Sequence, residues 1–188
     1  MAKLSVKPGY VPFVQQPYCC VPACIQMVMY RKGIKLVQQE DIGLALGLRV
    51  PRSMADAFER PNTRKRRVGY GTDIANHPID AFFKKEKIKL HFRYFPVFGT
   101  EEAKGLISKS IRENHDLIAC FNNGKLYDNR YRSGHVSVIS SIDGDKVVLI
   151  DPEYEVKKFR TVRLEKLLAA MKYHNRKKIN MAGFWQIS

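Results

Sequence analysis

The sequence predicts a single domain of the α+β class, in which N-terminal helices pack on a mainly antiparallel C-terminal sheet. Apolar residues recur at helical spacing through much of the first half, whereas the second half is rich in short apolar runs typical of strands. Two of these runs, residues 135–142 and 147–151, flank the turn sequence Asp143-Gly144-Asp145, as in a β-hairpin. No internal repeat and no linker divides residues 1–188, so we expect one domain.

The first helix is predicted from about Cys20 to the residues before Gly33. Ala23, Met27 and Tyr30 follow one another at helical spacing, and a glycine after two basic residues is a typical helix end. Pro22 falls in the first turn, where the backbone N–H groups have no partner within the helix. We therefore expect Cys20 at a helix N-terminus.

The remaining elements follow from periodicity and turn residues. Thr100, followed by two glutamates, is predicted as the N-cap of a helix that reaches about Asn114. Residues 60–72, which are rich in arginine and glycine, are predicted as a loop. The other predicted helices are residues 38–46, 54–58, 73–87 and 164–173, and the other predicted strands are 90–97, 117–121 and 184–187.

The composition excludes several classes of protein. The 188 residues include 33 Lys and Arg against 18 Asp and Glu, a net charge of +15, but 45% hydrophobic residues exclude a disordered basic tail. No apolar stretch reaches the about 18 residues of a membrane span, and the N-terminus lacks the apolar run of a secretory signal. We expect a cytoplasmic monomer with reduced cysteines, while delivery into another cell or compartment stays open.

A helix N-terminus favours negative charge, so it lowers the pKa of a cysteine there and makes the thiol more nucleophilic. Cys20 has that predicted position. A thiolate also needs a base, and the base needs an acceptor that orients it. If the hairpin loop consists of residues 142–144, His135 lies directly opposite Asp151, with Cβ atoms about 4.5–5.5 Å apart, whereas a two-residue loop shifts the partner by one. Each residue alone also fits a purely structural role, so only the combination indicates a Cys/His/Asp set.

The segment that enters the first helix reads Gln15-Gln16-Pro17-Tyr18-Cys19-Cys20-Val21-Pro22-Ala23. It resembles the active-site start of the papain-like double-glycine leader (bacteriocin-processing) peptidases and their stand-alone relatives. In that family a glutamine lies a few residues upstream of a Cys-Gly-Pro-Ala type motif. The predicted hairpin begins Gly134-His135-Val136-Ser137-Val138-Ile139 and closes with Asp151-Pro152, which resembles the family's second block. The resemblance implies a papain-like fold, and the rest of the chain agrees in element order.

The resemblance implies that Cys20 is the nucleophile, His135 the general base and acid, and Asp151 the residue that orients the imidazole. It also implies that an upstream glutamine side chain binds the oxyanion, a contribution of about 2.7–4 kcal/mol. Gln15, five residues before the cysteine, is nearer the family's usual spacing, and Gln16 stays open.

Two residues depart from the family's pattern. Val21 stands where the family usually has glycine, which counts against full activity. Cys19 competes as the nucleophile, although Pro22 and Ala23 match the motif in the register that favours Cys20.

The basic residues and the cysteines bear on partners and cofactors. Arg130, Arg132 and Gly134 lie just before His135 and are predicted to bind substrate, which suggests an acidic one. Nucleic acid stays open as a partner, but no recognised motif organises the basic runs. The cysteines lack the paired spacing of a structural zinc site, and no glycine-rich phosphate loop links a strand to a helix, so we expect neither metal nor cofactor.

The activity implied is hydrolysis of a peptide or isopeptide bond in a peptide or protein substrate, through a thioester acyl-enzyme. The same residues also suit acyl transfer to an amine, as in a transglutaminase-like enzyme, if an amine rather than water reaches the thioester. A third alternative is a catalytically weak papain-like scaffold that binds nucleic acid or an acidic protein.

Overall fold

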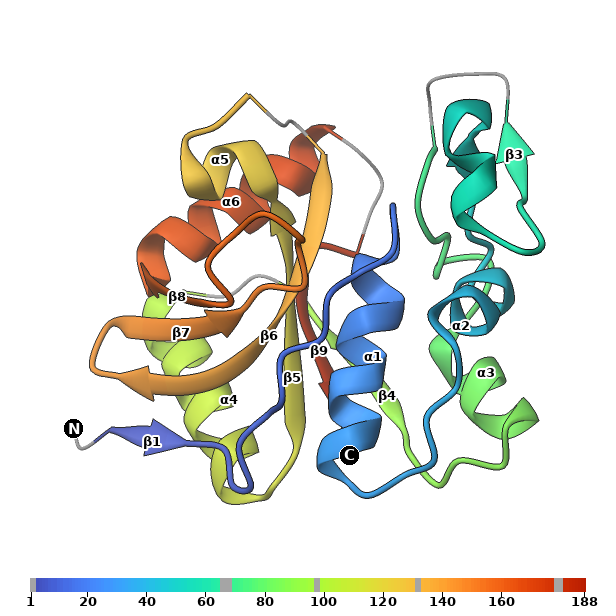
Figure 1. The fold of residues 1–188 in the computed structure, drawn as a ribbon. Helices are drawn as coiled ribbons and strands as arrows, with labels where there is room; N and C mark the ends of the chain where they lie inside the picture. The colour runs from blue at the N-terminus through green and yellow to red at the C-terminus, as the bar shows by residue number, and fades with distance from the viewer. Residues whose placement is uncertain (1–2, 65–68, 97–98, 131–132, 178–180) are drawn as a thin grey trace.

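The computed structural model describes residues 3–64, 69–96, 99–130, 133–177 and 181–188. Within these residues the centre is a seven-stranded sheet with the strand order β4-β9-β5-β6-β7-β8, in which β1 also pairs with β6 (Figure 1). Its strand pairs are antiparallel, which confirms the predicted α+β class. The strands are β1 (Leu4–Ser5), β4 (Phe92–Phe95), β5 (Asp116–Asn122), β6 (Gly134–Asp143), β7 (Lys146–Ile150), β8 (Phe159–Arg163) and β9 (Gly183–Ile187).

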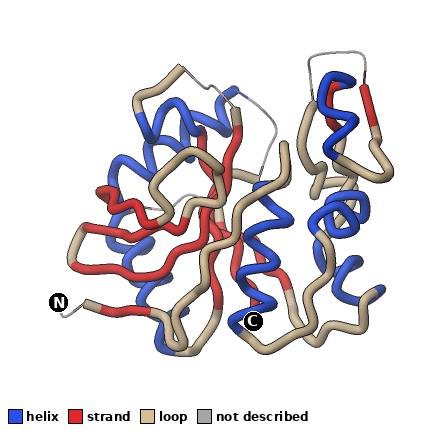
Figure 2. The backbone as a smooth tube through the Cα atoms, in the orientation of Figure 1, coloured by secondary structure: helices blue, strands red, loops and turns tan. Residues whose placement is uncertain are grey.

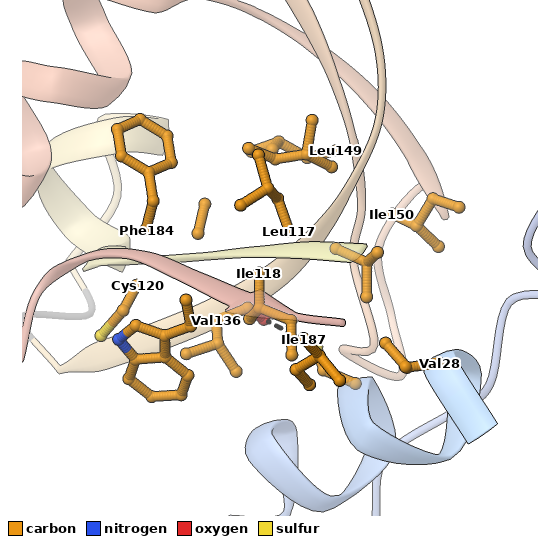
Figure 3. Packing of buried hydrophobic residues seen from close by; sticks show 14 of the residues in the cluster. Val28, Leu117, Ile118, Cys120, Val136, Leu149, Ile150, Phe184 and Ile187 are labelled. Carbon is orange, nitrogen blue, oxygen red and sulfur yellow. Dashed lines mark hydrogen bonds between the residues drawn. The ribbon is translucent and has the colours of Figure 1, made fainter. Parts of the chain in front are cut away.

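Helices cover both faces of this sheet. The helix α1 (Cys20–Arg31) lies against one face, and α4 (Thr100–Arg112) and α6 (Leu164–Lys177) lie against the other (Figure 1). Side chains along the strands point alternately to the two faces of the sheet. Leu117 and Phe184 lie on one side, and Ile118 lies on the other side with Val28 of α1 (Figure 3). Because both faces of the central strand β5 are covered, all seven of its residues are buried.

The predicted first helix is confirmed as α1, and an extended segment delivers its first residue to the sheet. Residues 9–16 run without regular structure from near β1 to the start of α1 (Figure 2). The backbone N–H of Gln15 donates to the carbonyl of Pro152 at 2.9 Å, so this segment is fixed to the residue that follows Asp151. Cys20 therefore begins α1 at the end of the sheet where β6 starts (Figure 1).

A second group of short elements lies on the side of α1 away from the sheet (Figure 1). The carboxylate of Glu40 is buried and accepts hydrogen bonds from the backbone N–H of Glu59, at 2.9 Å, and from that of Arg60. These bonds fix the segment around residues 59–60 to the helix α2, which contains Glu40. The group comprises α2 (Gln39–Ala45), the 3-10 helix η1 (Arg52–Ala57), α3 (Ile79–Lys85) and the parallel pair β2 (Val50–Pro51) with β3 (Thr63–Arg64).

Two predicted helix starts are wrong. The helix expected over residues 73–87 begins only at Ile79, because Pro78 disfavours helical backbone in the residue before it, and residues 73–77 form a turn instead. The N-cap of α4 is Gly99 rather than Thr100, and the Glu102 carboxylate accepts the Gly99 N–H at 2.9 Å.

The hairpin has the shorter of the two loop lengths that the sequence left open, so the three-residue loop that would set His135 opposite Asp151 does not occur. The loop between β6 and β7 has two residues, Gly144 and Asp145, with Gly144 at φ +57°, and the pairing shifts again between Ile139 and Ser141. Val138 therefore pairs with Ile150, which places Asp151 level with Ser137 rather than His135. The two site residues become diagonal neighbours on one face of the sheet, a relation that long side chains still bridge.

The short helix α5 (Asn123–Tyr127) and the strand β8 were not predicted. The helix is little more than one turn, and the Asn122 side chain caps it by accepting the Lys125 N–H at 2.9 Å. The strand reads Phe159-Arg160-Thr161-Val162-Arg163, and its two arginines and one threonine leave too few apolar residues for a clear period of two. Both elements contribute to the site described next.

Candidate active site

Cys20 differs from the other three cysteines in its exposure. All four thiols are free, but Cys19, Cys24 and Cys120 are buried, whereas Cys20 is half-buried at the first position of α1. Burial raises the pKa of Cys19 to about 12 and also raises the pKa values of Cys24 and Cys120. These three thiols are therefore held in the protonated, unreactive form at neutral pH. Among the four, Cys20 is the one placed to react.

His135 and Asp151 are in direct contact. The Nε2 atom of His135 lies 2.8 Å from Oδ1 of Asp151, and the two side chains are 5% and 1% exposed. The pairing of β7 with β6 reaches Val138 and Ile150, one residue before Asp151. The His135 ring packs edge-on against Phe121 of the neighbouring strand β5, with the ring centroids 5.7 Å apart. The sequence pattern that suggested this pair is matched in space, although the register is different.

The electrostatics of the pair favour the charged form of both groups. Burial alone would lower the pKa of His135, but hydrogen bonds and charges from Asp151 and Cys20 outweigh it and raise the pKa to about 10. Burial would raise the pKa of Asp151, but its hydrogen bond with His135 and the imidazolium charge hold it below the usual range. Because the thiol of Cys20 contributes to the shift, it lies within interaction distance of the imidazole. The three predicted residues are thus brought together.

The loop after Asp151 folds back over the site. Oδ1 of Asp151 accepts the backbone N–H of Glu153 at 3.0 Å, an Asx turn, and the N–H of Asp151 donates to the carbonyl of Lys158 at 2.8 Å. The Glu153 carboxylate in turn accepts from Nε2 of Gln15 at 3.2 Å. Glu153 was not predicted as a site residue, although the Asp-Pro pair before it is a turn signal that could have marked it.

Tyr127 and Arg160 also reach Asp151, and sequence reasoning missed both as site residues. Nη1 of Arg160 lies 3.6 Å from Oδ2 of Asp151, and its guanidinium carbon lies 3.3 Å from the centre of the Tyr127 ring. Nothing in the sequence signals this contact, because it depends on α5 and β8 meeting at the end of β7.

The remaining predicted residues are placed as follows. The side-chain oxygens of both Gln15 and Gln16 are buried without a hydrogen-bond partner among the described residues. Arg130 is exposed, and Arg132 lies outside the described residues. Gly134 begins β6, and a Cβ atom there would lie 2.8 Å from the His174 ring, so packing against α6 requires glycine at this position.

A groove of about 910 Å³ opens at the other end of α1, lined by residues 32, 34–38, 41 and 86–90, and so does not include the proposed site. No cluster of His, Cys, Asp or Glu side chains among the described residues is arranged to hold a metal ion. No described helix is long and apolar enough to span a membrane.

Comparisons with known proteins bear on the family and the fold. A family model described as "Peptidase_C39 like family" matches residues 9–181. A solved protein from Bacillus anthracis, described as a C39-like peptidase, has a TM-score of 0.60 at 15% identity over 100% of this chain and 98% of the other, which shows a shared fold. A double-glycine-motif protease from an AMS/PCAT transporter, solved with its leader peptide, has a TM-score of 0.48 at 16% identity over 97% and 95%. The search of curated proteins found no significant match.

Proposed function

The chain belongs to the Peptidase_C39-like family, and from this premise we propose that it is a papain-like cysteine peptidase that cleaves a peptide or isopeptide bond. The observation that carries the proposal is the position of the half-buried Cys20 beside the buried, hydrogen-bonded pair His135 and Asp151. In this reading Cys20 is the nucleophile, His135 the general acid and base, and Asp151 the acceptor that orients the imidazole.

In the acylation step, the thiolate of Cys20 attacks the carbonyl carbon of the scissile bond and forms a tetrahedral oxyanion. Nε2 of His135 is hydrogen-bonded to Asp151, so Nδ1 is the ring nitrogen that remains to exchange a proton with the thiol and the leaving group. The imidazolium donates its proton to the leaving amine as the C–N bond breaks, and a thioester remains on Cys20.

In the deacylation step, neutral His135 removes a proton from water as the water attacks the thioester carbonyl. The C–S bond then breaks, the product leaves as a carboxylic acid, and the thiolate–imidazolium pair is restored. An amine in place of water would give acyl transfer by the same steps. The arrangement of Cys20, His135 and Asp151 therefore supports an acyl-enzyme but does not distinguish water from an amine as the acceptor.

Gln15 is our proposed donor to the oxyanion, with Gln16 as the alternative. Support for Gln15 comes from its two links to the loop after Asp151, through the backbone to Pro152 and through the side chain to Glu153, which hold it beside the triad. Its amide nitrogen has a second hydrogen that the Glu153 contact leaves free for an oxyanion. Gln16 is held from the other side, because its backbone N–H donates to the Gln39 side chain at 2.8 Å.

The proposed substrate is a peptide segment. The double-glycine-motif protease, whose structure includes a leader peptide, motivates this class. The net charge of +15 and the exposed Arg130 in the connection that leads to His135 motivate acidic residues near the scissile bond. The basic residues 65–67 and Arg132 lie outside the described residues.

Labelling with iodoacetamide at pH 6 tests the proposal without knowledge of the substrate. Cys20 should be alkylated at least about 100-fold faster than Cys24, since a thiolate reacts and a buried thiol does not. The variant His135→Ala should slow the labelling of Cys20 strongly, and Cys20→Ser should abolish fast labelling altogether. Peptide mass spectrometry assigns each site.

The variant Cys24→Ser is the matched control, and it should leave the fast phase unchanged. Equal, slow labelling of Cys20 and Cys24 would rule out the catalytic proposal. With an acidic test peptide, Gln15→Ala should then reduce kcat about 100-fold and Gln16→Ala much less. The reverse order would move the oxyanion role to Gln16.

A further inference from the structure

Asp151 meets His135 at one carboxylate oxygen and Arg160 at the other. In the register of the sheet, Asp151 lies level with Lys158 of the return segment, and Arg160 lies two residues beyond on the same face. His135 is the corresponding diagonal neighbour on the opposite side, in β6. Three adjacent strand segments thus place an imidazole, a carboxylate and a guanidinium in a row, with Oδ1 toward His135 at 2.8 Å and Oδ2 toward Arg160 at 3.6 Å.

Tyr127 of α5 packs against the Arg160 end of this row. Its ring lies under the guanidinium of Arg160 and packs edge-on against Phe121, with the ring centroids 5.8 Å apart. Its hydroxyl is buried and forms no hydrogen bond of regular geometry among the described residues, and neither does the hydroxyl of Ser137, but Asp151 and Ser137 both lie near enough to interact with the phenol. Burial raises the pKa of Tyr127, and the nearby Asp151 charge raises it further, so the phenol stays neutral and can donate toward Asp151.

We propose that Arg160 and Tyr127 are positioning residues that hold the Oδ2 edge of Asp151, so that Oδ1 stays directed at His135 in the reactive pair with Cys20. This inference rests on the proposed function, since it assigns a role within that triad. The planar guanidinium suits the position because it can stack on the Tyr127 ring and at the same time face the carboxylate. A lysine could supply the charge but not the stacked plane.

The proposal has an electrostatic consequence for His135. The positive charge of Arg160 offsets part of the Asp151 charge, so its removal stabilises the imidazolium and shifts the titration of His135 to higher pH. The other titratable or charged groups around the ring are Cys20 of α1, Tyr127 of α5, His174 of α6 beside Gly134, and Glu153 and Lys158 of the loop after Asp151. None of them is changed in the Arg160 variants.

The test measures the rate of Cys20 alkylation against pH, together with the ¹⁵N NMR titration of the His135 ring. In Arg160→Gln the titration midpoint should rise by about half a pH unit, and the alkylation rate at pH 6 should fall about 10-fold through misplacement of the imidazole. Arg160→Lys should keep the wild-type midpoint because it keeps the charge. Tyr127→Phe, which removes only the hydroxyl, should move the midpoint in the same direction by less.

Arg163→Gln is the matched control, since Arg163 lies on the same strand β8 but is exposed and pairs with Lys146 at the far end of β7. Melting temperatures accompany each measurement. If Arg160→Gln lowers the melting temperature or the rate but leaves the midpoint of His135 unchanged, the role is merely structural and the inference is wrong. If wild-type Cys20 itself labels no faster than Cys24, it is the proposed function that fails, and this inference with it.

Discussion

The two ends of α1 carry clusters that share an aspartate, an arginine and a tyrosine but differ in their other residues and in how tightly the three are linked. In each, a buried aspartate of the sheet faces an arginine, and that arginine lies over the ring of a tyrosine. The Asp116 cluster, at the C-terminal end of α1, comprises Tyr10, Arg31, Lys32, Asn114 and Asp116. The Asp151 cluster, at the N-terminal end, comprises Tyr127, His135, Asp151 and Arg160 beside Cys20.

The Asp116 cluster is closed. The Tyr10 hydroxyl donates directly to Asp116, and Nε of Arg31 lies 2.6 Å from the same carboxylate with the arginine side chain only 1% exposed. Nη1 and Nη2 of Arg31 donate to Asn114 and to the carbonyl of Lys7, and Nζ of Lys32 lies 3.2 Å from the second oxygen of Asp116. This network holds the N-terminal segment, α1 and β5 together, and the buried carboxylate is paired with two cations.

The Asp151 cluster is looser. The carboxylate–guanidinium distance is 3.6 Å rather than 2.6 Å, the arginine is 26% exposed, and the Tyr127 hydroxyl lacks a direct partner among the described residues. It also contains His135, an imidazole that can both donate and accept a proton, and the Asp116 cluster has no such group. The same residue types therefore stabilise the fold where short ionic hydrogen bonds link them, and can support proton transfer where a histidine joins them.

The largest expected effect is on stability at the closed end. Asp116→Asn leaves the buried Arg31 without its counter-charge, so it should lower the free energy of unfolding by about 3–5 kcal/mol in urea denaturation. The alkylation rate of Cys20 in the protein that remains folded should stay at the wild-type value. A variant that lost labelling as well would contradict the separation of the two clusters.

The matched change at the other end, Asp151→Asn, should have the opposite profile. The cost in stability should be smaller, because His135 can lose its proton and Arg160 reaches solvent. The rate of Cys20 alkylation should nevertheless fall at least about 100-fold, since the amide no longer holds the imidazole in its charged, oriented form. Equal decreases in the free energy of unfolding of the two aspartate variants, measured by urea denaturation, would contradict the proposed difference between the clusters.

The smallest expected effect is a pH dependence that belongs to the Asp151 cluster. A histidine whose folded pKa is raised contributes stability that is fully present below its unfolded pKa of about 6.5 and is lost as the pH rises through the folded value, here about 10. The measurement compares Cys20→Ser with Cys20→Ser/His135→Gln, so that the thiol does not titrate. The difference in free energy of unfolding should shrink steadily above pH 6.5. In the Cys20→Ser background the decrease should end at a lower pH than about 10, because Cys20 no longer helps to raise the pKa of His135. A difference independent of pH would show that His135 carries no raised pKa.

Much of the helical and strand content is predictable from local sequence. The helix that starts at Cys20 follows from apolar spacing, a tolerated proline and a terminal glycine, and the structure confirms it as residues 20–31. The hairpin follows from two apolar runs around a turn sequence. These patterns are local, so they predict the elements without knowledge of tertiary contacts.

The failures have physical causes of two kinds. The start of α3 and the N-cap of α4 depend on single residues, Pro78 and Gly99, whose backbone effects override apolar periodicity. The hairpin register depends on loop length and on an irregularity between Ile139 and Ser141, neither of which a pattern of alternation specifies. The short elements α5 and β8 are too brief or too basic to carry a clear period.

Local sequence was enough to identify residues with the chemistry for a site: a cysteine at a helix start, a histidine at a strand start and an aspartate directly after a strand. Their contact depends on the tertiary structure, since His135 and Asp151 meet as diagonal neighbours rather than as the directly opposed pair that a three-residue loop would give. It also decided that Tyr127 and Arg160 belong to the same cluster. The reason is that burial, hydrogen bonding and charge depend on neighbours brought in from distant parts of the chain, and one-dimensional spacing carries no information about them.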